Sequence, residues 1–140
     1  MEIHNAGEDA LVVYLGHETS PETAARVQAA SAAIESALGS DLVDLVPSYA
    51  SVLVIYDLLQ TDHLSVRQRI HRALDTMGET AANEGKLVTL PVYYSAETGP
   101  DLERLASGAG LAVEDVIRIH RETEYRVYAI GFAPGFAYLG

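Results

Sequence analysis

The chain has 140 residues, of which 49% are apolar and 21% are charged, and it contains no cysteine. This length suffices for one domain, or two very small ones, with a core that needs no disulfide or metal. The 9 Lys and Arg against 20 Asp and Glu give a formal net charge of −11, which repels the phosphates of nucleic acids and anionic lipids. These values exclude thiol chemistry and make nucleic acid and membranes poor partners.

The N-terminal residues do not have the pattern of a targeting segment. Residues 1–10 carry Glu2, Glu8 and Asp9 and lack a basic region followed by an apolar run. The longest apolar runs, such as residues 52–56, are far shorter than the roughly 20 residues that a membrane-spanning helix needs. We therefore expect a soluble, cytoplasmic protein.

The first 94 residues predict four strands and two helices. Short apolar runs rich in β-branched and aromatic residues predict strands at residues 11–15, 42–46, 51–56 and 86–94. Ser20 followed by Pro21 predicts the start of a helix that ends at Gly39. Asp62 predicts the start of a second helix, which ends near Gly78.

The order strand, helix, strand, strand, helix, strand is that of a split βαβ fold. Right-handed crossovers then place both helices on one face of a four-stranded antiparallel sheet. The sequence therefore predicts an α+β protein whose residues 1–94 form a ferredoxin-like sandwich.

Residues 95–124 predict a helical connector. Gly99-Pro100-Asp101 opens one short helix, and residues 113–121 form another after the glycines at 108 and 110. A strand is expected over residues 125–130.

The last ten residues, Gly131 to Gly140, combine glycines, a proline and three aromatic side chains. Such a loop can line a pocket, and it can equally supply core residues to a following domain. An uncovered apolar strand is an association hazard. We therefore expect that the chain is the first part of a longer protein, with residues 125–140 either disordered or paired with a neighbouring molecule.

The other groups of polar residues in the sequence do not indicate a metal site or a catalytic site. His63, Arg67 and His71 share one helical face, but the arginine would repel a cation, so this face is interpreted as solvated and no metal site is predicted. The sequence lacks a nucleophile turn and the glycine loops that cradle phosphates. No catalytic residue is assigned.

Several segments together resemble a known family, that of the 5-oxoprolinase B subunit, also known as KipI or allophanate hydrolase subunit 1. The matching segments are Leu90–Tyr94, Gly99–Leu102, Glu114–Ile117, His120, Tyr125–Tyr128 and Gly131–Gly140. The sequence departs from the family pattern at Ser95-Ala96, where the family has two glycines, and at Ala137, where it has a proline.

The resemblance implies that residues 125–140 begin a truncated cyclophilin-like β-barrel. It implies a subunit that acts with companion subunits in an ATP-dependent hydrolase that opens an amide or lactam, with ATP used by the full complex and none bound by this chain alone. The alternative within the family is an inhibitor that docks on a sensor histidine kinase. Self-association through the uncovered end is a further expectation.

The resemblance also indicates which residues bind a substrate or another subunit. These residues are Gly131, Phe132, Pro134, Gly135, Phe136, Tyr138 and His120.

Overall fold

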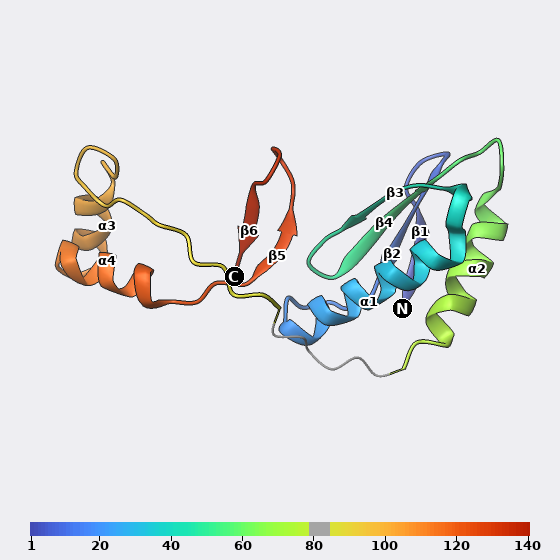
Figure 1. The fold of residues 1–140 in the computed structure, drawn as a ribbon, viewed down its shortest axis with the longest axis horizontal. Coiled ribbons are helices and arrows are strands. Elements are labelled where there is room, and N and C mark those ends of the chain that lie inside the picture. Colours follow the sequence, from blue (N-terminus) through green and yellow to red (C-terminus); the bar gives the residue numbers. More distant parts are fainter. Residues whose placement is uncertain (79–84) are drawn as a thin grey trace. The chain divides into compact units, whose positions relative to one another are not determined.

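The computed structural model describes residues 1–78 and 85–140 (Figure 1). The chain divides into two compact units, one made of Met1–Glu84 with Val127–Gly140 and the other of Gly85–Arg126. Among the described residues, no helix has the length and apolar character needed to cross a membrane.

The first unit is built on a four-stranded antiparallel sheet. Its strands are β1 (Glu2–Asn5), β2 (Ala10–Tyr14), β3 (Leu42–Pro47) and β4 (Ser51–Tyr56), in the order β1-β2-β4-β3. Successive side chains of a strand point to opposite faces, and the alternate residues Val52, Val54 and Tyr56 of β4 are buried. These positions, with Leu11 and Val13 of β2, define the face of the sheet that carries the core.

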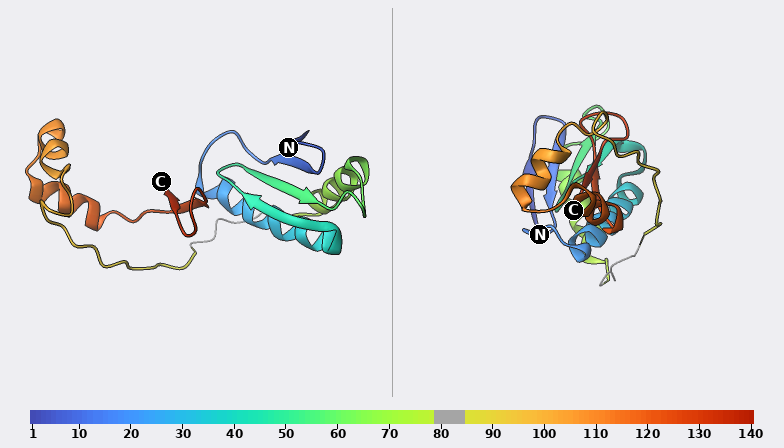
Figure 2. Two further views of the ribbon diagram at one scale, coloured as in Figure 1. Left: turned by 90° about the horizontal axis from the view of Figure 1, so that it is seen from above. Right: turned by 90° about the vertical axis from the view of Figure 1, so that its left-hand side faces the viewer.

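Two helices cover that face, α1 (Pro21–Leu38) and α2 (His63–Asp75) (Figures 1 and 2). The predicted caps are present, since the Ser20 side chain accepts a hydrogen bond from the Thr23 amide and the Asp62 side chain accepts from two amides of α2. After α1, Gly39 has a φ of 53°, a conformation that glycine adopts readily. A short 3-10 turn, η1 (Gly39–Asp41), then leads into β3.

The prediction of a strand at residues 86–94 is wrong. Residues 85–94 form no strand, and the edge beside β2 is filled instead by β1, which pairs from Glu2 opposite Tyr14 to Asn5 opposite Leu11. A hairpin between neighbouring segments closes a much shorter loop than a return from residue 86, and Pro91 removes one ladder donor from the predicted strand. The order is therefore ββαββα, and the predicted split βαβ order is not observed, although the antiparallel sheet and its two helices are confirmed.

Two arginines of α2 donate hydrogen bonds to backbone carbonyls and side-chain oxygens of neighbouring elements. Arg67 donates to the Ile3 carbonyl at 2.5 Å and to Oδ1 of Asn5 at 2.7 Å, which fastens the edge strand β1. Arg69 donates to the carbonyls of Ala37 and Leu38 at the end of α1 and to the Asp41 carboxylate at 2.5 Å. The last carbonyls of a helix have no partner within it, so Arg69 caps α1 from outside.

The second unit contains two short helices, α3 (Leu102–Ala109) and α4 (Val113–Glu122). Both predicted connector helices are thus confirmed. Helix α3 ends at Gly110, which has a φ of 68° and whose amide donates to carbonyls of the last turn. Among residues 85–126, Ala106 is the one apolar residue that is buried.

The end of the chain forms a hairpin of β5 (Val127–Ile130) and β6 (Ala137–Leu139). The expected strand is therefore present from residue 127. The expectation of disorder is wrong for this structure, because β5 pairs with β6 of the same chain. Pairing of this hairpin with a neighbouring molecule stays a prediction. The described residues close no barrel, since the second sheet has two strands.

Replacing Arg69 by methionine, which keeps the apolar stem, should lower the free energy of unfolding by about 2 kcal/mol, because it removes charge-assisted bonds to otherwise unpaired carbonyls. Arg72→Met, on an exposed position of the same helix, is the matched control and should change it by less than about 0.5 kcal/mol. Urea unfolding followed by circular dichroism measures both values. Equal effects of the two substitutions would contradict the capping role.

Candidate functional site

The loop between β5 and β6 is held by its own backbone. The Gly131 amide donates to the Phe136 carbonyl at 3.1 Å, and the Phe136 amide donates to the Ala133 carbonyl at 3.0 Å. Gly135 has a φ of 78°, which explains a glycine there. Pro134, whose φ is fixed by its ring, precedes it and stiffens the turn. The loop residues predicted from the sequence are therefore brought together in one closed turn.

Phe132 lies at the tip of this loop in an unusual conformation. Its φ is 64°, the sole positive φ among the non-glycine residues that the structure describes, and 91% of its surface is exposed. A bulky side chain in the left-handed region costs free energy. The structure therefore holds a strained backbone at the residue whose ring is presented to solvent.

Aromatic rings extend from this tip to the main sheet. Phe132 contacts Phe136 with ring centroids 5.6 Å apart, and Phe136 contacts Tyr138 at 5.2 Å, both edge to face. Tyr49, in the turn between β3 and β4, lies 6.3 Å from Tyr138 and stacks on Tyr128 at 5.9 Å. We call these five residues the aromatic row, and Tyr49 connects the hairpin to the rest of its unit.

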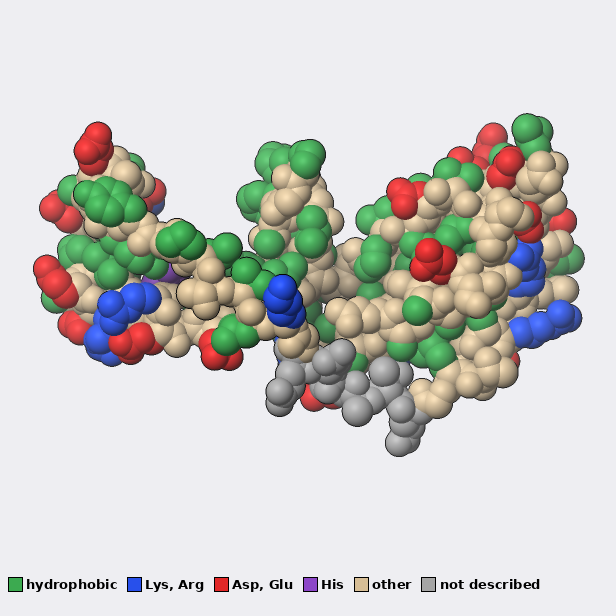
Figure 3. Space-filling model, viewed as in Figure 1, with side chains coloured by type: hydrophobic (Ala, Val, Ile, Leu, Met, Phe, Trp, Pro, Cys, Tyr) green, Lys and Arg blue, Asp and Glu red, His purple; other side chains and the backbone are tan. Residues whose placement is uncertain are grey.

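Tyr49 is the site residue that sequence reasoning missed. Its signal was a large aromatic side chain in a tight turn between two strands, where small polar residues are usual. The hairpin that it contacts is almost entirely apolar on its surface (Figure 3), with Ile130 and Leu139 also more than half exposed.

His120 belongs to the second unit, whereas the loop belongs to the first. It lies at the end of α4, where its Nδ1 is 2.6 Å from the hydroxyl of Tyr94 and its ring contacts that of Tyr125. The predicted site residues therefore come from both units.

The histidine face of α2 has structural partners. Nδ1 of His63 is hydrogen-bonded to the hydroxyl of Tyr56, and Arg67 holds β1. Burial raises the pKa of Tyr56, and the carboxylates of Asp9 and Asp62 raise it further. Hydrogen bonds from Ser65 lower the pKa of Asp62, the cap of α2. Within residues 1–78 and 85–140, no three His, Asp or Glu side chains are grouped to hold a metal ion.

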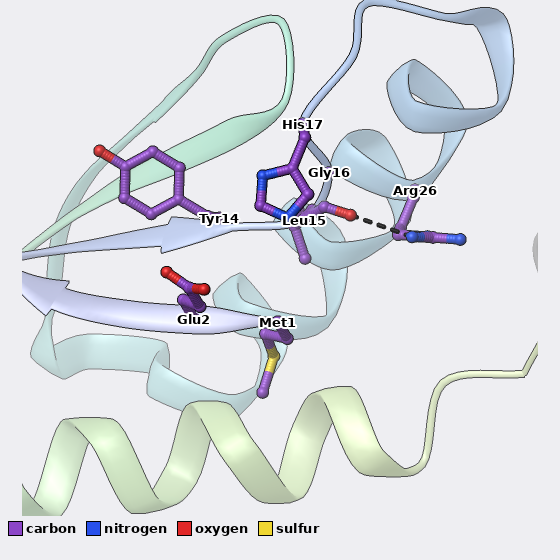
Figure 4. Close-up of a pocket in the computed structure, with 7 residues that line it drawn as sticks. All are labelled: Met1, Glu2, Tyr14, Leu15, Gly16, His17 and Arg26. Atoms are coloured by element: carbon purple, nitrogen blue, oxygen red, sulfur yellow. Dashed lines mark hydrogen bonds between the residues drawn. The ribbon is translucent and has the colours of Figure 1, made fainter.

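A cavity of about 200 Å³ lies at the edge of the main sheet. It is lined by Met1, Glu2, Tyr14, Leu15, Gly16, His17 and Arg26 (Figure 4). The guanidinium of Arg26 donates to the Leu15 carbonyl at 3.0 Å, and a hydrogen bond with His4 lowers the pKa of Glu2. Arg26 is therefore bonded to the backbone of the cavity wall, and Glu2 is bonded to His4 outside the cavity.

The chain belongs to the family described as carboxyltransferase domain, subdomain C and D, which it matches over residues 1–140. It is similar to the 5-oxoprolinase B subunit of Bacillus subtilis (strain 168), with 34% identity across 99% of this chain and 62% of that protein. It is also similar to the 5-oxoprolinase B subunit of Escherichia coli O157:H7, with 32% identity across 71% of this chain and 45% of that protein. The family resemblance predicted from the sequence is therefore confirmed.

A solved structure supports the same relationship. The crystal structure of TTHA0988 matches this chain with a TM-score of 0.76 and 35% identity, covering 93% of this chain and 25% of that one. The chain therefore spans less than two thirds of each of these relatives.

Replacing Tyr49 by alanine should release the hairpin, because two ring contacts of about 1 kcal/mol each are lost. Amide hydrogen exchange of residues 127–140 should become about tenfold faster or more. Tyr93→Ala, which removes a tyrosine that is 77% exposed in the other unit, is the control and should leave that exchange unchanged. Unchanged exchange in Tyr49→Ala would show that the aromatic row does not hold the hairpin.

Proposed function

We propose that this chain is part of one subunit of a 5-oxoprolinase-type enzyme, which uses ATP to open the lactam of 5-oxoproline to glutamate together with companion subunits. Its similarity to proteins named as the B subunit of 5-oxoprolinase supports the proposal. Those names also support the expectation of companions, because they describe one member of a set. We further propose that the aromatic row and its loop form part of a substrate or subunit interface.

The observation that carries the interface is the composition of the hairpin. Residues 127–140 contain no charged side chain, although the chain as a whole has a net charge of −11. The centres of protein interfaces are depleted in charge and enriched in aromatic residues. An uncharged, exposed aromatic surface on so acidic a chain is therefore suited to being covered by a partner or by an apolar ligand surface.

The chemistry requires an activated carbonyl. Transfer of the γ-phosphoryl group of ATP to the amide oxygen, with ADP as the leaving group, would provide that activation. Water would then add to the activated carbon, the C–N bond would break to leave an acyl phosphate, and hydrolysis of the acyl phosphate would release glutamate and phosphate. We propose that the full complex uses ATP and that this chain alone does not bind it, as the family resemblance implies.

A second candidate function is that of a regulatory protein that binds a sensor histidine kinase. This is the alternative implied by the resemblance to the KipI members of the family. The net charge of −11 favours a basic partner surface, and the exposed hairpin would serve such docking as well. In this alternative the protein has no substrate. A pull-down that recovers a kinase and no hydrolase subunits would favour it.

The finer description of the fold also remains a proposal. We propose that the hairpin of β5 and β6 belongs to a cyclophilin-like barrel, and that the first unit is a variant of the ferredoxin-like sandwich in which β1 replaces the last strand.

The test is the release of glutamate from 5-oxoproline by the full-length protein reconstituted with its companion subunits and ATP. We expect activity in the complex, and Phe132→Ala should reduce it about tenfold, the effect of losing one buried aromatic anchor. Leu59→Ala is the matched control, because Leu59 is also exposed, at 92%, but lies in the loop after β4. A complete complex that releases no glutamate would refute the proposed function.

A further inference from the structure

Three aromatic residues from separate segments meet in the second unit, of which His120 and Tyr125 are exposed and Tyr94 is half-buried. Tyr94 precedes the turn before α3, His120 lies in the last turn of α4, and Tyr125 follows that helix. The ring centroid of His120 lies 5.8 Å from that of Tyr94 and 5.5 Å from that of Tyr125, with interplanar angles of 80° and 43°. We call these three residues the histidine cluster.

Local structure fixes each member of the histidine cluster. The turn after Tyr94 is closed by the Thr98 hydroxyl, which donates to the Tyr93 carbonyl at 3.1 Å, and by the Gly99 amide, which donates to the Ser95 carbonyl at 2.8 Å. A side chain at Gly99 would lie 2.9 Å from Leu102, so the turn is tight against α3.

The C-terminal end of α4 is closed in a similar way. The Thr123 hydroxyl donates to the Ile119 carbonyl at 2.7 Å, and the Thr123 amide donates to the same carbonyl. The chain then leaves the helix in an extended conformation, which brings Tyr125 to the imidazole. The cluster is thus held at both of its ends.

The hydrogen bond within the cluster determines which nitrogen of His120 is available. The Tyr94 hydroxyl lies 2.6 Å from Nδ1, so Nδ1 is occupied. Among the described residues, Nε2 has no hydrogen-bond partner. When the Tyr94 hydroxyl donates to Nδ1, the neutral imidazole carries its proton on Nε2 and presents it outward as a donor.

A purely structural explanation accounts poorly for this arrangement. Hydrogen bonds between exposed side chains compete with water and contribute little to stability. Helix α4 is already supported by ion pairs of Arg118 with Asp115 and Glu122. A second residue that fixes the tautomer and orientation of a histidine is instead the usual support of a functional imidazole.

We propose that Nε2 of His120 donates a hydrogen bond to the carbonyl oxygen of the amide or lactam substrate. In this proposal Tyr94 is a positioning residue that keeps the proton on Nε2, and Tyr125 fixes the ring from the side. The inference rests on the proposed function and names the group of this chain that touches the substrate. A hydrogen bond to this oxygen would hold the amide in the orientation in which the oxygen can attack the γ-phosphorus of ATP.

Two substitutions at His120 separate this role from a structural one. Asparagine places an acceptor near the position of Nδ1 and can keep the bond to Tyr94, whereas glutamine places a donor near the position of Nε2. In the full-length protein with its companion subunits, we expect His120→Asn to lower kcat/KM about a hundredfold, because the amide oxygen is no longer held in position for phosphoryl transfer. We expect His120→Gln to lower kcat/KM less, by about tenfold. A structural role predicts the opposite order.

Tyr94→Phe tests the positioning role. It should lower kcat about tenfold, because the imidazole loses its fixed tautomer, while the melting temperature and the assembly with companion subunits stay unchanged. Tyr93→Phe removes the same atom from the adjacent residue and should leave kcat unchanged. Wild-type kcat/KM in His120→Asn, or equal effects of Tyr93→Phe and Tyr94→Phe, would overturn the proposal.

A binding measurement separates failure of this inference from failure of the proposed function. In the full-length protein, the imidazole resonances of His120, assigned by their loss in His120→Asn, should shift when 5-oxoproline is added. If the complete complex releases no glutamate, the proposed function is refuted and this titration alone decides the binding role. Resonances of His120 that do not move up to the solubility limit of 5-oxoproline would overturn the inference.

Discussion

The burial of one face of the main sheet under two helices is the constraint on which the rest of the first unit depends. Side chains of β2 and β4 alternate into a core that contains no buried polar or charged residue among the described positions. A dry core of this kind fixes the register of β4 against β3, because a slip of one residue would turn every apolar side chain outward. The turn between these strands is thereby fixed, and with it Tyr49, which positions the hairpin and its strained loop.

The second unit is organised by different forces. Ala106 is the single fully buried apolar side chain among residues 85–126, so area burial cannot be what orders this unit. Its geometry comes instead from helix ends, a tight turn before α3 and the hydrogen bond between Tyr94 and His120. Polar interactions of this type are directional but individually weak.

Local signals predicted much of the fold. The caps at Ser20 and Asp62 and the breaks at Gly39 and Gly110 lie where the sequence indicated, because each acts within one helical turn. The strand β1 was missed because its residues Glu2–Asn5 are mostly polar and become a strand through pairing with β2. The prediction of a strand at residues 86–94 was wrong because an apolar run does not specify the strand with which it would pair. The loop of the candidate site was found from its glycines and aromatic residues. Tyr49 had a local signal, the aromatic side chain in a tight turn, but that signal does not specify the rings it contacts, and Tyr94 meets His120 only through tertiary structure.

The left-handed backbone at Phe132 also bears on how this protein tolerates change. Glycine at that position would relax the backbone and delete the ring, so stability favours glycine whereas the proposed interface needs phenylalanine. Selection for heat resistance alone would therefore tend to remove the exposed ring from the tip of the hairpin.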